Sequence, residues 1–305
     1  MFSIQDLRGV LPALATPLTR DGAVDEPAVE RLVEHVLAGG VHGLLPLGST
    51  GEAASLDGPA RRKLLAAVVK AAAGRVPVLS GVVQSQLGAA RADVKAAAEL
   101  GAVAALVAPP YYYPIDQATV LAFYRAVAAD SPLPILIYNI PQNTKVVTEP
   151  ATVATLAHEG AVVGIKDSSR DFEYFSNVCL ATRDLPGFRI FTGSDTMLLA
   201  ALAMGGAGTI CAAANIAPGW VVRVFDDFER GDWQAARSHQ DKLLEVAAAV
   251  RTGVFPAGIK AALQMQGVCE PWPVAPVAAL DEAARGRLRE RLEKWGLLAA
   301  VPLKP

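Results

Sequence analysis

Histidine and cysteine are scarce in this chain, and neither is spaced as a metal or redox site requires. The four histidines form no HxH or HExxH spacing and fall on expected helices or before an expected strand: His35, His42, His158 and His239. The three cysteines, Cys179, Cys211 and Cys269, form no CxxC pair and are typical of reduced, mostly buried thiols. We therefore expect no metal site, no cofactor and no Ser–His–Asp hydrolase.

Long apolar runs and blocks of like charge are also missing. Although 52% of the residues are hydrophobic, no run approaches about 18 uninterrupted apolar residues, so the sequence predicts no membrane span. The start, MFSIQDLRGV, lacks the basic and apolar regions of a signal peptide, which makes the cytoplasm the expected location. With 28 basic and 30 acidic residues and no basic block, nucleic acid is not an expected partner.

What the sequence does contain is a regular alternation of short apolar runs and helix-like segments. Eight runs rich in Val, Ile, Leu and Ala are each followed by a helical pattern; they cover residues 10–18, 41–52, 76–82, 102–110, 133–141, 162–169, 188–195 and 207–215. This number and order predict an α/β fold, a (β/α)8 TIM barrel. An open doubly wound sheet is the alternative. It is less favoured, because no glycine-rich dinucleotide turn follows the first run.

Only helical patterns follow the eighth run. They cover residues 218–231, 232–250, 256–267 and 280–298, with a stiff PWPVAP connection before the last. We therefore expect a barrel domain over residues 1–225 and a C-terminal helical extension over residues 226–305.

Lys166 ends one of the apolar runs, VVGIK. Burying an ammonium group without a partner is costly, and many strand-end lysines reach back to water instead. In a barrel, however, the carboxyl ends of the strands meet on one face, where these enzymes keep their chemistry. The role of Lys166 therefore depends on what the other strand ends bring to that face.

Two other strand ends bring hydroxyl groups. Ser49 and Thr50 lie between Gly48 and Gly51, where hydroxyls and backbone N–H groups can hold one carboxylate, although a plain capped turn is the alternative. Tyr138 lies near the end of the fifth run, where the apolar strand residues stop, and is a candidate proton shuttle, with a buried, hydrogen-bonded phenol as the alternative. A lysine nucleophile implies Schiff-base chemistry with a carbonyl compound, and these groups suit an α-keto acid.

Three adjacent tyrosines, residues 111–113, follow the fourth run and are either an interface patch or part of the site. Gly193 and Ile210 stand at the ends of the seventh and eighth runs.

Five motifs in this order, GSTGE, PPYYY, YNIP, GIKDSS and GSD, resemble those of the dihydrodipicolinate synthase / N-acetylneuraminate lyase family. The resemblance covers nearly the whole chain. It implies a class I aldolase that uses pyruvate and an aldehyde, on a (β/α)8 barrel with a C-terminal helical extension. It also implies a homotetramer built as a dimer of dimers.

The resemblance also implies roles for single residues. Lys166 corresponds to the Schiff-base lysine and Tyr138 to the proton donor and acceptor, while Thr50 and Ser49 correspond to the residues that bind the pyruvate carboxylate. Ser49 would share a proton relay with Tyr138 and with a Tyr112 that reaches in from the neighbouring subunit. Ile210 would lie beside the pyruvyl carbons. Besides these positions, we expect Gly48, Asn143, Ser168 and Gly193 to bind substrate, because they lie at or just after the strand ends.

Departures from the family pattern bear on the substrate. Asn143 stands where the synthases carry an arginine that holds the aldehyde's carboxylate, Arg170 replaces the usual glycine, and Tyr113 replaces an asparagine. Asn143 and Ser168 suit a hydroxyl-bearing partner, so we expect a 2-keto-3-deoxy sugar acid or a 4-hydroxy-2-oxoglutarate type substrate. The lysine-biosynthetic synthase is the alternative, because Arg170 or Lys145 could replace the missing cation. A non-catalytic keto-acid sensor is the alternative of another class.

Overall fold

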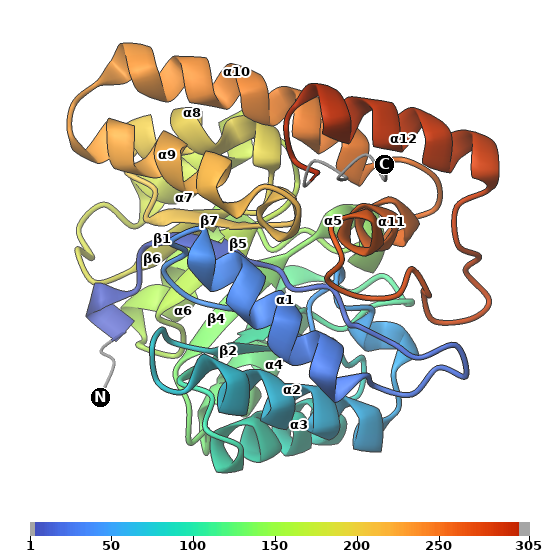
Figure 1. Cartoon of the computed structure of the whole chain (residues 1–305). Coiled ribbons are helices and arrows are strands. Elements are labelled where there is room, and N and C mark those ends of the chain that lie inside the picture. Colours follow the sequence, from blue (N-terminus) through green and yellow to red (C-terminus); the bar gives the residue numbers. More distant parts are fainter. Residues whose placement is uncertain (1–3, 299–305) are drawn as a thin grey trace, which may run out of the picture.

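The computed structural model describes residues 4–298, and its centre is one curved sheet of seven parallel strands (Figure 1). The sheet order is β1-β7-β6-β5-β4-β3-β2. The strands are β1 Gly9–Pro12, β2 Leu79–Val82, β3 Ala104–Val107, β4 Ile135–Asn139, β5 Gly164–Asp167, β6 Arg189–Thr192 and β7 Gly208–Cys211. The predicted α/β architecture is confirmed, and the curled parallel sheet is consistent with a TIM barrel.

The second expected strand is an irregular segment that lies between β1 and β2. On one side the Leu45 N–H donates to the Pro12 carbonyl at 3.0 Å; on the other the Leu44 N–H donates to the Pro77 carbonyl at 2.9 Å. Pairing is limited to single bridges, Ala13 with Leu45 and Leu44 with Val78. A regular strand does not form here, because Pro46 has no N–H to donate and Leu47 turns to a φ of 62°.

Helices follow the strands and cover the outside of the sheet (Figure 1). Aspartates accept hydrogen bonds from backbone N–H groups at several helix starts, as Asp25 does from Ala28 at 3.1 Å. The helices are α1 Glu26–Ala38, α2 Gly58–Ala72, α3 Leu87–Glu99, α4 Gln117–Ala128, α5 Pro141–Thr144, α6 Pro150–His158, α7 Phe172–Ala181, α8 Leu198–Ala203, α9 Pro218–Glu229, α10 Trp233–Val250, α11 Ala257–Met265 and α12 Glu282–Lys294.

The sheet separates two apolar layers. Alternate strand residues point to opposite faces, so Ile137 and Ile165 pack in the layer beneath the helices, whereas Leu136 and Phe191 pack inside the curved sheet. Tyr138 belongs to the inner layer. The same alternation brings Lys166, next to Ile165, to the inner side.

Helices α10, α11 and α12 follow the last strand (Figure 1). Helix α10 packs along α9, and α9 contacts β1. Position 225, the expected domain boundary, lies within α9. Among residues 4–298, no helix combines the length and apolar character needed to cross a membrane.

Candidate active site

Lys166 lies on β5, is 3% exposed, and faces Tyr138 on the neighbouring strand β4. The two residues are paired in the parallel register. The Lys166 Nζ atom lies 4.4 Å from the centre of the Tyr138 ring. Adjacent parallel strands place paired residues on the same face, and the register therefore brings the amine and the phenol together.

The Tyr138 hydroxyl is linked to the loop that follows the irregular segment. Its oxygen lies 3.1 Å from Ser49 Oγ, and either group can donate the hydrogen bond. Asn143 Nδ2 in α5 donates to the same Ser49 Oγ at 3.4 Å. The Tyr138 and Ser49 hydroxyls are thus hydrogen-bonded next to Lys166, and their predicted proton relay stays a prediction.

A cavity of about 360 Å³ opens beside these groups. Its wall includes the Lys166 amine and the Tyr138 phenol. The other predicted site residues on the wall are Ser49, Thr50, Asn143, Ser168, Gly193 and Ile210. The structure therefore joins residues from several strand ends in one concave site of the size that small-molecule sites have.

Two predicted residues do not line this cavity. Tyr112 is 80% exposed, and its ring contacts Tyr113 edge-on with ring centres 5.0 Å apart. Its predicted role is in the site of a neighbouring subunit, so that role stays a prediction. Gly48 lies one residue before Ser49, and its carbonyl accepts a hydrogen bond from the Ala53 N–H at 3.3 Å; its substrate contact also stays a prediction.

The cavity wall includes residues that the sequence analysis did not assign to the site. Gln142 precedes Asn143 in α5, and its position beside a predicted residue was the only signal for it. Asp195 follows β6. Arg251 and Phe255 lie just after α10, in the segment assigned to the C-terminal extension. No local pattern marks these last two, because only the path of the chain after α10 brings them to the cavity.

A buried polar cluster supports the ends of β4 and β5 next to Lys166 and Tyr138. Asn139 Nδ2 donates to Asp167 Oδ1 at 2.8 Å, and the Ser169 hydroxyl donates to Asp167 Oδ2 at 2.9 Å. Burial raises the pKa of Asp167, and these hydrogen bonds oppose the rise. The Thr148 N–H in turn donates to Asn139 Oδ1 at 3.1 Å. The cluster fixes the backbone that carries Tyr138 and Lys166.

Other nucleophiles and metal ligands are poorly placed in the part of the chain that the structure describes. No group of three or more His, Cys, Asp or Glu side chains in residues 4–298 is arranged to hold a metal. The expected absence of a metal and of a cofactor stays a prediction. Burial raises the pKa of Cys179 to about 11 and that of Cys269 to about 12, which keeps both thiols protonated near neutral pH.

Gly193 leaves the space that the Lys166 side chain occupies. A Cβ atom at this position would overlap Ser168 Oγ and would lie 2.8 Å from Lys166 Cε. We expect Gly193→Ala to lower kcat/KM by about 10²-fold, because a displacement of about 1 Å in a site can have that effect. The overlap should also cost about 1–3 kcal/mol of unfolding free energy.

Steady-state kinetics and denaturant unfolding measure both effects of Gly193→Ala. Gly187→Ala is the matched control, because a Cβ atom there meets nothing within 4 Å. Wild-type kinetics in a folded Gly193→Ala protein would contradict this account of the site.

Comparison with known proteins decides the family. The family model described as "Dihydrodipicolinate synthetase family" matches residues 6–295. The chain belongs to this family. The predicted resemblance is therefore confirmed, and with it the prediction of an enzyme, a lyase of the class I aldolase type.

Members of the dihydrodipicolinate synthetase family resemble the chain over almost its full length. A protein of Phenylobacterium zucineum named 4-hydroxy-tetrahydrodipicolinate synthase is 38% identical over 291 residues, which cover 95% of this chain and 98% of the relative. A protein of Halobacterium salinarum named as an uncharacterized DapA-like lyase is 35% identical over 292 residues, which cover 96% of this chain and 95% of the relative. A family structure from E. coli K12 in complex with pyruvate superposes with a TM-score of 0.92 at 28% identity, covering 95% and 99% of the two chains.

Proposed function

We propose that this member of the family is a Schiff-base-forming aldolase that condenses pyruvate with an aldehyde, or cleaves a 2-oxo-4-hydroxy acid in reverse. The observation that carries the proposal is the buried Lys166 amine, 4.4 Å from the Tyr138 ring centre in a cavity that also presents the Ser49 and Thr50 hydroxyls. The pyruvate complex of the E. coli K12 relative supports the choice of α-keto acid.

The geometry supports a reaction in four steps. Ser49 and Thr50 hold the pyruvate carboxylate while the Lys166 amine attacks the ketone carbon; water leaves with a proton from Tyr138, and a protonated imine remains. The Tyr138 oxygen then takes a proton from the methyl carbon, which converts the protonated imine to a neutral enamine. The enamine carbon adds to the aldehyde carbon, and Tyr138 donates its proton to the new alkoxide. Water then adds to the protonated imine and returns a proton to Tyr138, and the hydrolysis releases the product and restores the Lys166 amine.

The residues around the aldehyde's end of the cavity support a hydroxyl-bearing partner. Asn143 and Ser168 line the cavity, and they offer neutral hydrogen bonds where a fixed cation would be needed for a second carboxylate. We therefore propose a 2-keto-3-deoxy sugar acid or a 4-hydroxy-2-oxoglutarate type substrate.

The lysine-biosynthetic synthase remains the alternative function. The relative from Phenylobacterium zucineum has the corresponding name. Arg170 lines the cavity and can supply a cation there, whereas the Lys145 amine donates to the Gln142 carbonyl at 2.9 Å and is not part of the wall.

A substrate panel separates these functions. We expect cleavage of 2-keto-3-deoxy sugar acids or of 4-hydroxy-2-oxoglutarate, followed by pyruvate release, to exceed condensation of pyruvate with aspartate semialdehyde by tenfold or more in kcat/KM. That ratio corresponds to about 1.4 kcal/mol of transition-state binding, the size of one hydrogen bond in the site. Arg170→Gln should leave the preferred reaction within about threefold, since it removes less than 1 kcal/mol.

Two other outcomes of the panel would favour the alternative functions. Comparable turnover of aspartate semialdehyde, lost in Arg170→Gln, would contradict the substrate preference and favour the synthase. Pyruvate binding without turnover of any compound would favour a keto-acid sensor.

The architecture and assembly of the chain are part of the same proposal. Residues 42–46 donate hydrogen bonds to β1 and accept them from β2, which supports a closed (β/α)8 barrel in which this segment is the eighth strand. We also propose a barrel domain of residues 1–225 with a C-terminal helical extension of residues 226–305. The exposed Tyr112 supports a homotetramer, a dimer of dimers, in which this phenol reaches the neighbouring site.

A further inference from the structure

A second buried lysine lies outside the cavity, in α11. Lys260 is 0% exposed, and its Nζ atom lies 2.5 Å from Glu52 Oε1 and donates to the Trp272 carbonyl at 2.6 Å. Burial lowers the pKa of Lys260, and the Glu52 carboxylate opposes that change. A buried ammonium is tolerated only with such partners. The Lys260 side chain can therefore be buried in α11 because the Glu52 carboxylate lies against it.

Glu52 belongs to the loop that supplies the carboxylate-binding hydroxyls. It follows Ser49 and Thr50 directly after Gly51, and its backbone N–H donates to the Ser49 carbonyl at 3.1 Å. Its φ of 57° lies in the left-handed region, which a residue with a Cβ atom adopts only when its surroundings hold it there.

The C-terminal segment provides that hold. Lys260 binds Glu52 Oε1, and the Val274 N–H donates to Glu52 Oε2 at 2.6 Å. Both carboxylate oxygens are therefore occupied by groups more than 200 residues further along the chain.

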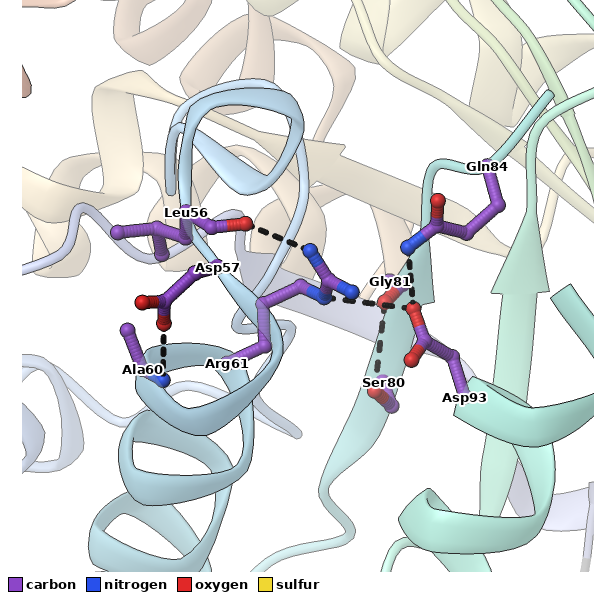
Figure 2. A network of polar contacts seen from close by, with 8 residues as sticks. All are labelled: Leu56, Asp57, Ala60, Arg61, Ser80, Gly81, Gln84 and Asp93. Atoms are coloured by element: carbon purple, nitrogen blue, oxygen red, sulfur yellow. Dashed lines mark hydrogen bonds and ion pairs between the residues drawn. The ribbon is translucent and has the colours of Figure 1, made fainter. Parts of the chain in front are cut away.

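The far end of the same loop is held separately (Figure 2). Figure 2 shows Arg61 of α2 between the Leu56 carbonyl, to which it donates at 2.6 Å, and the Asp93 carboxylate, 3.3 Å away. Asp93 also accepts from Gln84 Nε2 at 2.7 Å. These contacts fix the start of α2 and do not reach residues 49–52. That part of the loop is held by Glu52, by the hydrogen bonds of Ser49 to Tyr138 and Asn143, and by Thr16. At the near end, the Thr16 hydroxyl donates to the Gly51 carbonyl at 2.6 Å.

We propose that Glu52 and Lys260 form a positioning pair through which α11 holds Ser49 and Thr50 in place for the pyruvate carboxylate. This inference rests on the proposed function. Neither Glu52 nor Lys260 lines the cavity; the pair acts through the two residues that precede Gly51. In this proposal the C-terminal segment packs against the barrel and also positions residues that bind the substrate.

Three variants test the pair: Glu52→Gln, Lys260→Met and the double variant. The single variants leave one buried polar or charged group without its partner, so they should lower stability. The double variant removes both charges together, which buried pairs tolerate much better.

We expect the double variant to fold and to regain thermal stability. Its KM for pyruvate should nevertheless stay raised about tenfold, because misplacement of about 1 Å weakens a site by up to 10²-fold. Its kcat should stay closer to the wild-type value, since Lys166 and Tyr138 are untouched.

Asp227→Asn is the matched control. Asp227 is also a buried carboxylate held by a side chain of another helix, His239 Nδ1 at 2.6 Å, but it lies between α9 and α10, away from the loop. We expect this control to lose stability without a change in the KM for pyruvate.

Borohydride trapping of pyruvate on the wild-type protein is run alongside, and it keeps the two proposals apart. A wild-type adduct together with an unchanged KM in the folded double variant would overturn the positioning role alone. The positioning role would also be overturned if the KM for pyruvate rose in the destabilised single variants but returned to the wild-type value in the stable double variant. No adduct in the wild-type protein would overturn the proposed function and the positioning role together.

Discussion

Lys166→Ala is expected to lower aldolase activity by about 10⁴-fold or more, the order found when a covalent nucleophile is removed. The reason is chemical: without this amine no imine can form, and the cavity has no second lysine on its wall among the described residues. Borohydride reduction in the presence of pyruvate measures this directly. The wild-type protein should gain the mass of pyruvic acid less one oxygen atom, on the peptide that contains Lys166, and the variant should gain nothing.

Two other lysines make this experiment specific. Lys145 lies in the loop after α5, and its amine donates to the Gln142 carbonyl, so Lys145→Ala should trap pyruvate as the wild-type protein does. Lys260 is buried but is engaged by Glu52. An adduct that persists in Lys166→Ala, or one on the Lys260 peptide, would show that the wrong amine has been assigned.

Tyr138→Phe is expected to lower kcat by about 10²–10⁴-fold, the usual contribution of a positioned acid–base group. The substitution keeps the ring beside the Lys166 amine but removes the hydroxyl that lies 3.1 Å from Ser49 Oγ. Pyruvate should still be trapped on Lys166 after long incubation, because the nucleophile remains. Stopped-flow kinetics of adduct formation and steady-state turnover separate these two effects.

Tyr124→Phe is the matched control for the loss of a buried tyrosine hydroxyl. Tyr124 is fully buried, and its hydroxyl donates to the Val107 carbonyl at 2.9 Å, outside the cavity wall. Its removal should cost about 0.5–1.5 kcal/mol of stability and leave kcat unchanged. If Tyr138→Phe also kept kcat within tenfold of the wild-type value, the proton would have to reach the alkoxide by another path.

Much of the fold could be predicted from local patterns. Apolar runs of a few residues, each followed by a capped amphipathic segment, predict parallel strands and helices, and α1 is an example, since it begins directly after its capping residue Asp25. The second run was the exception, because Pro46 and the positive φ of Leu47 prevent a regular strand while its backbone still pairs on both sides.

The central pair of the site was also within reach of the sequence. A lysine and a tyrosine at the ends of adjacent parallel strands must meet when the strands pair in register, and Tyr138 and Lys166 do so. The motifs around them were sufficient to identify the family. The sequence by itself thus determined the type of fold and placed together the lysine amine proposed as the nucleophile and the phenol beside it.

Only the tertiary structure decided how the site is completed and held. The need for glycine at position 193 follows from the Lys166 and Ser168 side chains that pass it, which no pattern around Gly193 reveals. Arg251 reaches the cavity wall, and Lys260 reaches Glu52, because the chain after α9 folds back over the strand ends. Strand periodicity and helix capping are local, so they can be read over a few residues. Contacts between residues 52 and 260 depend on the packing of every element between them, and they exist only once the whole chain has folded.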